Sequence, residues 1–227
     1  MHYHVSFDID FKRNKGKGFF VAIEGVDGAG KTTQVKSLCD ELSKKYKVYE
    51  TKNPTESEIG QLIRRVLAGR VNIPPKSFQY LFAADRQVQQ VELLKQLKKE
   101  TIVVTDRYFW SALVYGIVDR QDLDFEKSAN LLLVILGILS MYHQFIIPDL
   151  TIYLDIPIKI ALSRIDKTKK SKEIYENKEK LIKIQKGYEW LCNKFPKEIT
   201  RIDGTKSKHQ VTKDILDLIN KLKNHRL

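Results

Sequence analysis

Cysteine and long apolar runs are both scarce in this chain of 227 residues. Its two cysteines, Cys39 and Cys192, stand in no metal or redox spacing, so we expect a reducing compartment and a cytoplasmic location. The longest apolar stretch, Leu131 to Leu139, is shorter than the roughly 18 residues that a membrane-spanning helix needs. No apolar segment of signal-peptide length occurs near Met1, so we expect neither export nor a membrane partner.

Acidic residues are also few: 28 Asp and Glu stand against 40 Lys and Arg, which gives a formal net charge of +12. This excess favours a polyanionic partner, and nucleic acid, an anionic membrane or phosphorylated small molecules would all satisfy it. With 42% hydrophobic and 30% charged residues, the composition is that of a globular protein and excludes a disordered chain. The length suits a single α/β domain.

Five apolar, β-branched runs alternate with helical patterns along most of the chain. The runs are Phe19 to Glu24, Lys47 to Thr51, Thr101 to Asp106, Leu150 to Asp155 and Glu198 to Asp203. This alternation predicts an α/β fold in which a five-stranded parallel sheet is flanked by helices. No low-complexity linker or internal repeat interrupts the pattern, so we interpret residues 19–227 as one domain.

Two segments differ from this alternating pattern. Residues 1–18 are polar and basic without a sustained period, and we interpret them as a mobile basic arm. Leu131 to Tyr142 is apolar on every side of a helix. That pattern predicts that several faces of the helix are covered, either by the domain core or by a second subunit.

A phosphate-binding loop follows the first apolar run, because Gly25 to Thr32 matches G-x-x-x-x-G-K-[ST] at every fixed position. In this motif, backbone N–H groups and the N-terminus of the next helix converge on phosphate. We expect Lys31 to reach the β- and γ-phosphates of ATP and Thr32 to hold Mg²⁺. The expected ATP contacts of the loop are Gly25, Gly28, Ala29, Gly30, Lys31, Thr32 and Thr33.

A phosphate-binding loop alone leaves the reaction open, because kinases, ATPases, GTPases and helicases all use one. The Asn-Lys-x-Asp motif with which GTPases read guanine is absent from the sequence. Large motor ATPases need further domains that 227 residues cannot hold. The choice among the remaining classes therefore depends on residues outside the loop.

Two pairs of residues indicate an acceptor site. Asp106 and Arg107 follow each other at the end of the third apolar run, at the sheet edge where open α/β folds bind ligands. A carboxylate there can bind Mg²⁺ through water, and a guanidinium can clamp a phosphate. Phe82 and Arg86 are four residues apart in a helical pattern, so one helix face presents a stacking ring beside a fork of donors.

Together, these motifs resemble those of the thymidylate kinases from about residue 19 to the C-terminus. The matching stretches are Glu24 to Thr33, Lys52 to Thr55, Ile63 to Arg65, Phe82 to Arg86, Asp106 to Gly116, Pro148 to Leu150, Tyr153 to Asp155 and Tyr175 to Asn177. The resemblance implies a three-layer P-loop NTPase fold and, together with the apolar helix, a twofold homodimer buried through Leu131 to Tyr142. It also implies transfer of the γ-phosphoryl of ATP to dTMP, with Mg²⁺ required, giving dTDP.

The resemblance further implies how dTMP is bound. Phe82 would stack on thymine, and Arg86 would donate to the thymine O4. Asp27 would meet the sugar 3′-hydroxyl, and Tyr115 would crowd the 2′ position. Ser111 would belong to the same dTMP site.

Other residues are matched by the resemblance to phosphate, metal and adenine. Arg64 and Arg107 correspond to arginines near the acceptor phosphate, and Asp106 to the carboxylate of the metal site. Arg164 corresponds to the arginine that packs on adenine. Residues 164–175 would form a lid.

Three departures from the family pattern bear on the site. Lys52 to Pro54 stands where many relatives have Arg-Glu-Pro, and Ala112 stands where bacterial relatives often place a hydroxyl or amide facing the base. Gly28 and Ile174 occupy the two positions that usually supply an arginine to the transferred phosphoryl. We expect lysines of the lid to supply this charge as catalytic residues: Lys169, Lys170 and Lys172.

Two other functions remain open on the sequence. One is a kinase for another nucleoside or nucleoside monophosphate, which a panel of substrates would separate from a dTMP kinase. The other is a non-catalytic P-loop protein that binds nucleic acid, which the charge of +12 would suit. We expect ATP and dTMP, rather than nucleic acid, to be the partners.

Overall fold

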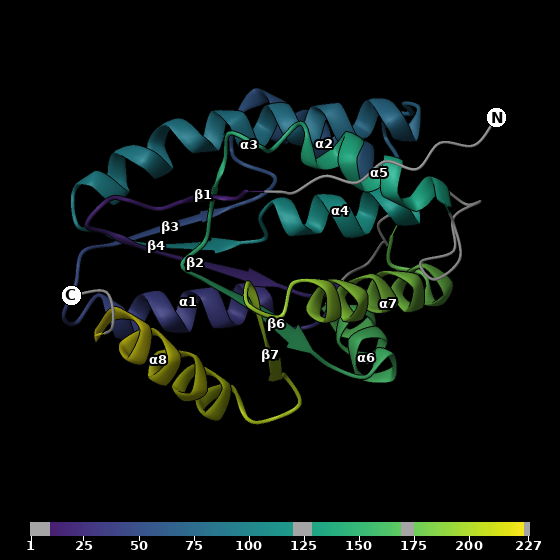
Figure 1. Ribbon diagram of the computed structural model, residues 1–227. Coiled ribbons are helices and arrows are strands. Elements are labelled where there is room, and N and C mark those ends of the chain that lie inside the picture. The colour runs from purple at the N-terminus through teal and green to yellow at the C-terminus, as the bar shows by residue number, and fades with distance from the viewer. Residues whose placement is uncertain (1–9, 120–128, 169–174, 225–227) are drawn as a thin grey trace.

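Five parallel strands form the central sheet of the computed structural model, which describes residues 10–119, 129–168 and 175–224 (Figure 1). The strands are β2 (Phe19–Glu24), β3 (Val48–Lys52), β4 (Ile102–Asp106), β6 (Leu150–Asp155) and β7 (Ile199–Asp203). Their order in the sheet is β3-β4-β2-β6-β7, and every neighbouring pair is parallel. The predicted α/β fold is confirmed, and each expected strand appears with its ends shifted by no more than one residue.

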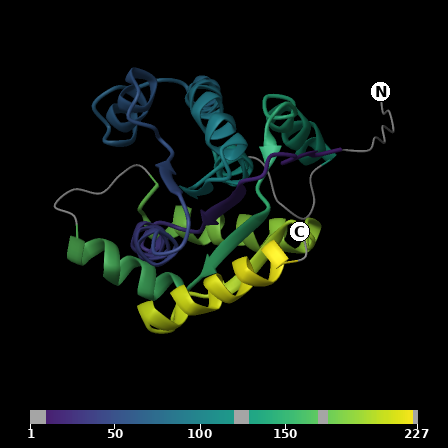
Figure 2. The same ribbon diagram turned by 90° about the vertical axis from the view of Figure 1, so that its left-hand side faces the viewer.

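Helices cover both faces of this sheet. They are α1 (Lys31–Leu42), α2 (Glu58–Leu67), α3 (Pro75–Lys98), α4 (Phe109–Val118), α5 (Ala129–Leu139), α6 (Ile158–Thr168), α7 (Lys178–Lys194) and α8 (Lys208–Asn224). Helices α1 and α8 pack together on one face, whereas α3, α4 and α7 lie on the other (Figures 1 and 2). The central strands β2 and β4 are therefore buried along their whole length, which explains their continuous apolar runs.

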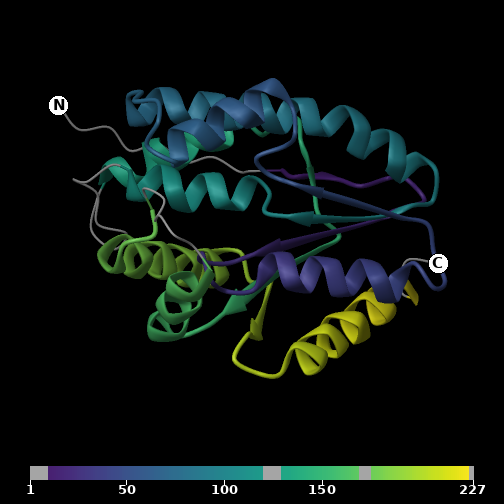
Figure 3. The ribbon, with the colours of Figure 1, turned by 180° about the vertical axis from the view of Figure 1, so that it is seen from behind.

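The parallel arrangement places the carboxyl ends of the strands at one edge of the sheet. The loop after β2 leads into α1, and the loop after β4 carries Arg107 into α4 (Figure 3). Residues from loops that are far apart in the sequence therefore meet at this edge, where open α/β sheets bind ligands.

Residues 10–18 belong to the folded domain, which corrects our expectation of a mobile arm for this part of residues 1–18. Strand β1 (Lys12–Arg13) pairs in parallel with β5 (Ile146–Ile147). The amide of Asn14, which is buried, donates to the Asp149 carboxylate at 2.7 Å. Residues 1–9 lie outside the described residues.

Phe11 explains why this N-terminal segment is held. Its ring lies 5.6 Å from that of Trp110 and 5.9 Å from that of Phe195, measured between ring centroids. Such an aromatic cluster stabilises the segment by removing apolar surface from water. A single aromatic residue in a polar segment has no periodicity, so sequence patterns could not reveal this contact.

The apolar helix α5 lies largely in the core. Leu131, Val134, Ile135 and Ile138 are buried, whereas the side chain of Leu133 is 66% exposed. Core burial therefore accounts for most of its apolar surface. In the ranges 10–119, 129–168 and 175–224, no helix is both long enough and apolar enough to cross a membrane.

Candidate active site

Glycines shape the loop between β2 and α1. Gly28 and Gly30 have φ angles of +79° and +95°, in the left-handed region that side chains disfavour. A Cβ on Gly28 would also lie 2.4 Å from the carbonyl oxygen of Ala161 in α6. The loop leads directly into the N-terminus of α1, where free backbone N–H groups favour an anion.

Lys31 begins α1 and is buried beneath this loop. Its Nζ donates to the carbonyl of Val26 at 2.9 Å and lies 3.7 Å from the Asp27 carboxylate. Burial lowers the pKa of Lys31, and the positive charge of Arg107 lowers it further. A bound phosphate would supply the negative charge that favours the ammonium form of Lys31.

Thr32 and Asp106 meet across the carboxyl ends of the strands. The Thr32 hydroxyl donates to the Asp106 carboxylate at 2.6 Å, although the two residues are 74 positions apart. A hydroxyl beside a carboxylate is a donor set that suits Mg²⁺, which usually takes few protein ligands and completes its shell with water and substrate phosphate. The described residues contain no cluster of three or more groups that would form a metal site by themselves.

Arg107 stands at the centre of the site in a left-handed backbone conformation, with a φ of +70°. Its guanidinium pairs with the Asp27 carboxylate at 2.5 Å and donates to the hydroxyls of Ser111 at 3.1 Å and Tyr188 at 3.2 Å. It also lies over the Tyr115 ring, 5.1 Å from the centroid. These contacts fix the orientation of a fork of donors that can hold a phosphate in two hydrogen bonds.

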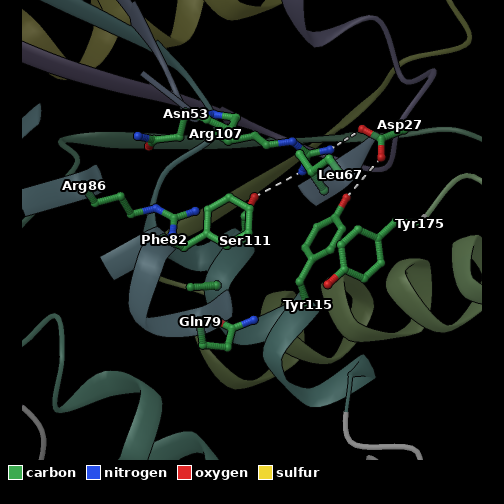
Figure 4. A pocket seen from close by; sticks show the side chains of 12 residues that line it. Asp27, Asn53, Leu67, Gln79, Phe82, Arg86, Arg107, Ser111, Tyr115 and Tyr175 are labelled. Carbon is green, nitrogen blue, oxygen red and sulfur yellow. Dashed lines mark hydrogen bonds and ion pairs between the residues drawn. The ribbon is translucent and has the colours of Figure 1, made fainter. Parts of the chain in front are cut away.

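A pocket of about 110 Å³ opens beside Arg107 (Figure 4). It is lined by Asp27, Asn53, Pro54, Leu67, Gln79, Phe82, Arg86, Arg107, Ser111, Ala112, Tyr115 and Tyr175. The lining combines apolar and aromatic side chains with polar and charged ones, and such a combination gives a small-molecule site both contact area and orientation. Asp27 belongs to the phosphate-binding loop and Arg107 pairs with it, and both line the pocket, so a ligand here would lie next to a bound nucleotide.

Arg86 is 1% exposed and lies between two aromatic rings of the pocket wall. Its guanidinium carbon is 5.2 Å from the centroid of Phe82 and 5.6 Å from that of Tyr142. One nitrogen donates to the Tyr142 hydroxyl at 3.1 Å, while the buried Nε has no hydrogen-bond partner in the described residues. The pocket therefore has a buried cation with an unused donor next to a ring available for stacking.

The comparisons with known proteins agree with this geometry. The family model for thymidylate kinase matches residues 23–215 of the chain. The chain belongs to the thymidylate kinase family. It is 42% identical over 175 residues to the probable thymidylate kinase of Methanococcus aeolicus, covering 77% of this chain and 79% of that one. It is 34% identical to the thymidylate kinase of a Thermoanaerobacter species, covering 90% and 98%.

A solved structure of the family superposes well on this one. Thymidylate kinase from Candida albicans matches with a TM-score of 0.77 and 26% sequence identity. The match covers 92% of this chain and 93% of that one. The family's P-loop fold therefore extends over nearly the whole domain.

Seven residues are expected at the dTMP site of this thymidylate kinase family member. Six of them line the pocket: Asp27, Phe82, Arg86, Arg107, Ser111 and Tyr115. The seventh, Arg64, is not among the described residues that line the pocket. It donates to the carbonyl of Pro54, which does line it, at 2.9 Å, and pairs with Glu56 at 2.9 Å. The contact of Arg64 with the pocket is therefore indirect, through Pro54.

On the nucleotide side, Arg164 in α6 donates to the carbonyls of Ala29 at 3.2 Å and Gly28 at 3.4 Å. Thr33 is exposed in the first turn of α1, and Gly25 lies against Leu154 of β6. The expected catalytic lysines Lys169, Lys170 and Lys172 lie outside the described residues, as does Ile174.

Sequence reasoning missed a buried carboxylate under the site. Glu24, at the end of β2, is 1% exposed and accepts the backbone N–H groups of Tyr108 at 2.9 Å and Ser111 at 3.3 Å. It also accepts the hydroxyls of Ser111 and Tyr188, the latter at 3.0 Å. Glu24 thereby anchors the start of α4. The one feature of the sequence that pointed to this residue was its position directly before the glycine loop.

Proposed function

We propose that this protein transfers the γ-phosphoryl group of ATP to dTMP and forms dTDP. The observation that carries the proposal is the shared position of Asp27 and Arg107. Both line the pocket that contains Phe82 and Arg86, Asp27 is part of the phosphate-binding loop, and Arg107 pairs with Asp27. An acceptor held by the pocket would therefore present its phosphate to a nucleotide on the loop, as direct phosphoryl transfer requires.

On the donor side, the backbone N–H groups of the loop and the Nζ of Lys31 hold the β- and γ-phosphates of ATP. Thr32 and Asp106 are the residues that would hold Mg²⁺. Bound there, the ion would neutralise charge on the phosphate oxygens. Arg164 lies against the carbonyls of the loop, and we assign it to the adenine side of ATP.

On the acceptor side, the Phe82 ring stacks on thymine, and Arg86 donates to its O4. A guanidinium can only donate, so it opposes the amino group that cytosine carries at the same place. Arg107 exchanges its contact with Asp27 for the acceptor phosphate, and the freed carboxylate meets the sugar 3′-hydroxyl. Tyr115, whose hydroxyl lies 3.5 Å from Asp27, leaves no room for a ribose 2′-hydroxyl.

A coupled assay of ADP formation with ATP tests the proposal against dTMP, dUMP, UMP and dCMP. We expect kcat/KM to be highest for dTMP, and lower by about 10⁴ for dCMP, because the unpaired donor of Arg86 rejects it. Lys31→Met should abolish turnover and serves as the control for contaminating kinases. Equal turnover of all four nucleotides, or no ADP formation with any of them, would contradict the proposal.

We also propose that two chains associate through α3 into a homodimer. Tyr80, Ala84, Val88, Val91 and Leu94 recur on α3 at intervals of three or four residues and are all exposed, with Tyr80 at 69% and Val91 at 71%. An apolar stripe of this kind on one helix favours a self-complementary twofold contact. Among the described side chains, this stripe exposes more apolar residues than the segment from Leu131 to Tyr142, where we expected the contact.

Sedimentation of the protein at micromolar concentration tests the dimer. We expect a species of twice the 26.4 kDa chain mass, which Val91→Asp should convert to the monomer. Leu222→Asp, a matched change at an exposed apolar position on α8, should leave the dimer intact. A wild-type monomer would rule out this assembly.

A further inference from the structure

Gln79 is a buried amide without a partner. It lies on α3, lines the pocket and is 8% exposed. Neither its amide oxygen nor its amide nitrogen forms a hydrogen bond within the part of the chain that the structure describes. An unpaired buried amide costs about 1–3 kcal/mol of stability, so its presence calls for a compensating partner.

The fold provides space for this amide. Gln79, Phe82 and Arg86 are spaced i, i+3 and i+7 on α3, so one helix face directs all three into the pocket. Opposite them, a Cβ on Gly116 would lie 3.2 Å from the Cδ and 3.3 Å from the Oε1 of Gln79. The absence of a side chain at Gly116 therefore leaves room for the Gln79 amide.

Figure 4 places Gln79 away from the end of the pocket where Asp27 and Arg107 meet. The acceptor phosphate belongs at the Arg107 end under the proposed function. The Gln79 end is consequently available to the base. Ala112, which also lines the pocket, has no polar side-chain atom to offer there.

The hydroxyl groups of the pocket wall already have partners in the described structure, and Arg86 has only a donor, its Nε, left unused. The Ser111 hydroxyl donates to Glu24, the Tyr175 hydroxyl to Asp119, and the Tyr115 hydroxyl to Asp27. Asn53 has a free buried oxygen, but its amide nitrogen is directed to the Asp85 carboxylate at 3.3 Å. Among the described residues that line the pocket, Gln79 is the one that offers an unused donor and an unused acceptor side by side.

The edge of a thymine ring needs such a pair. It presents the N3–H donor flanked by the O2 and O4 acceptors, and Arg86, which can only donate, cannot accept from N3–H. We propose that Gln79 determines base specificity by reading N3, with its amide oxygen accepting the N3–H and its amide nitrogen donating to the adjacent O2. This inference rests on the proposed function, because it requires dTMP in the pocket.

A purely structural role for Gln79 predicts a different effect of its replacement on the stability of the free protein. Burial raises the pKa of Asp119, and the Tyr175 hydroxyl and the nearby Gln79 amide act against this rise, although the amide forms no hydrogen bond with Asp119. If Gln79 served only to steady Asp119, its replacement would destabilise the free protein. If it serves the base, replacing the unpaired amide by an apolar group should leave the free protein equally stable or more stable.

Gln79→Met, which keeps the length of the side chain and removes the amide, tests the proposal in the full-length protein. We expect the KM for dTMP to rise about tenfold or more, because two hydrogen bonds to the base are lost. The kcat and the KM for ATP should change by less than about twofold. The Tm of the free protein should not fall. Gln96→Met, the same change farther along α3, should leave the KM for dTMP as it is.

A spectroscopic measurement gives a second readout. With dTMP labelled with ¹⁵N at N3, the imino proton should appear as a protected NMR signal on binding to the wild-type protein and be lost on binding to Gln79→Met. Gln79→Asn, which withdraws the amide by one methylene, should lose the signal too and provides the variant to use if the methionine protein does not fold.

The outcomes separate this inference from the proposed function. If the wild type phosphorylates dTMP but Gln79→Met has an unchanged KM for dTMP and an unchanged imino signal, the role of Gln79 is overturned and the kinase activity stands. A fall in Tm without a change in KM would likewise assign Gln79 to Asp119. A wild type that does not turn over dTMP would overturn the proposed function itself.

Discussion

Glu24 offers the sharpest test of how the site is held together. A single oxygen of its carboxylate, Oε1, accepts the backbone N–H groups of both Tyr108 and Ser111 at the start of α4. The other oxygen accepts the hydroxyls of Ser111 and Tyr188. The carboxylate thus acts as a helix cap supplied by a neighbouring strand, in a position that water does not reach.

Glu24→Ala should reduce the free energy of unfolding by about 4 kcal/mol. The variant leaves two buried N–H groups without an acceptor, at about 1–3 kcal/mol each. The two hydroxyls lose less, because Ser111 and Tyr188 are already 2.9 Å apart and can pair with each other. Glu24→Gln retains one oxygen for both N–H groups, so it should cost only about 1–2 kcal/mol.

Urea titrations followed by circular dichroism measure both variants at equal protein concentration. Glu50→Ala, which removes an exposed carboxylate from β3, is the control and should change the free energy of unfolding by less than about 0.5 kcal/mol. A cost for Glu24→Ala below about 1 kcal/mol, or an equal cost for the alanine and glutamine variants, would refute the capping role.

Three further predictions concern the site and its surroundings. Arg86→Ala should remove most of the preference for dTMP over dCMP, measured as the ratio of kcat/KM values, and an unchanged ratio would exclude Arg86 as the reader of O4. Burial raises the pKa of the Cys39 thiol to about 12 and that of Cys192 to about 11, so iodoacetamide near neutral pH should modify Cys192 faster than Cys39, as peptide mass spectrometry would show. Burial raises the pKa of Asp119 above its usual 3.8, so the stability contributed by its protonated form is complete below that pH and is lost as the pH rises through the folded-state pKa. The free energy of unfolding of Asp119→Asn should therefore increase relative to that of the wild type as the pH rises. An equal dependence of this free energy on pH in the two proteins would contradict the raised pKa of Asp119.

Short-range patterns predicted the scaffold well. The five strands were found from apolar runs because central parallel strands are buried on both faces. The phosphate-binding loop was found because its chemistry depends on glycines, a lysine and a hydroxyl at fixed spacing. In both cases the physical requirement acts on residues that are close together in the sequence.

Patterns of this kind failed where function or stability depends on distant side chains. Tyr188 contacts Glu24 across 164 positions, and nothing in the periodicity of α7 distinguishes it from an ordinary core aromatic. Phe11 was assigned to a mobile arm because its partners, Trp110 and Phe195, lie far along the chain. The burial of such residues depends on which elements pack together.

The sequence by itself therefore determined the fold class, the phosphate-binding loop and, through its motifs, the family. The tertiary structure alone decided which polar groups are paired and which are left free. It joined Asp27 to Arg107, capped α4 with Glu24 and left the amide of Gln79 unpaired in the pocket. The physical reason is that the cost of a buried polar group depends on the atoms around it, and those atoms come from segments that only folding brings together.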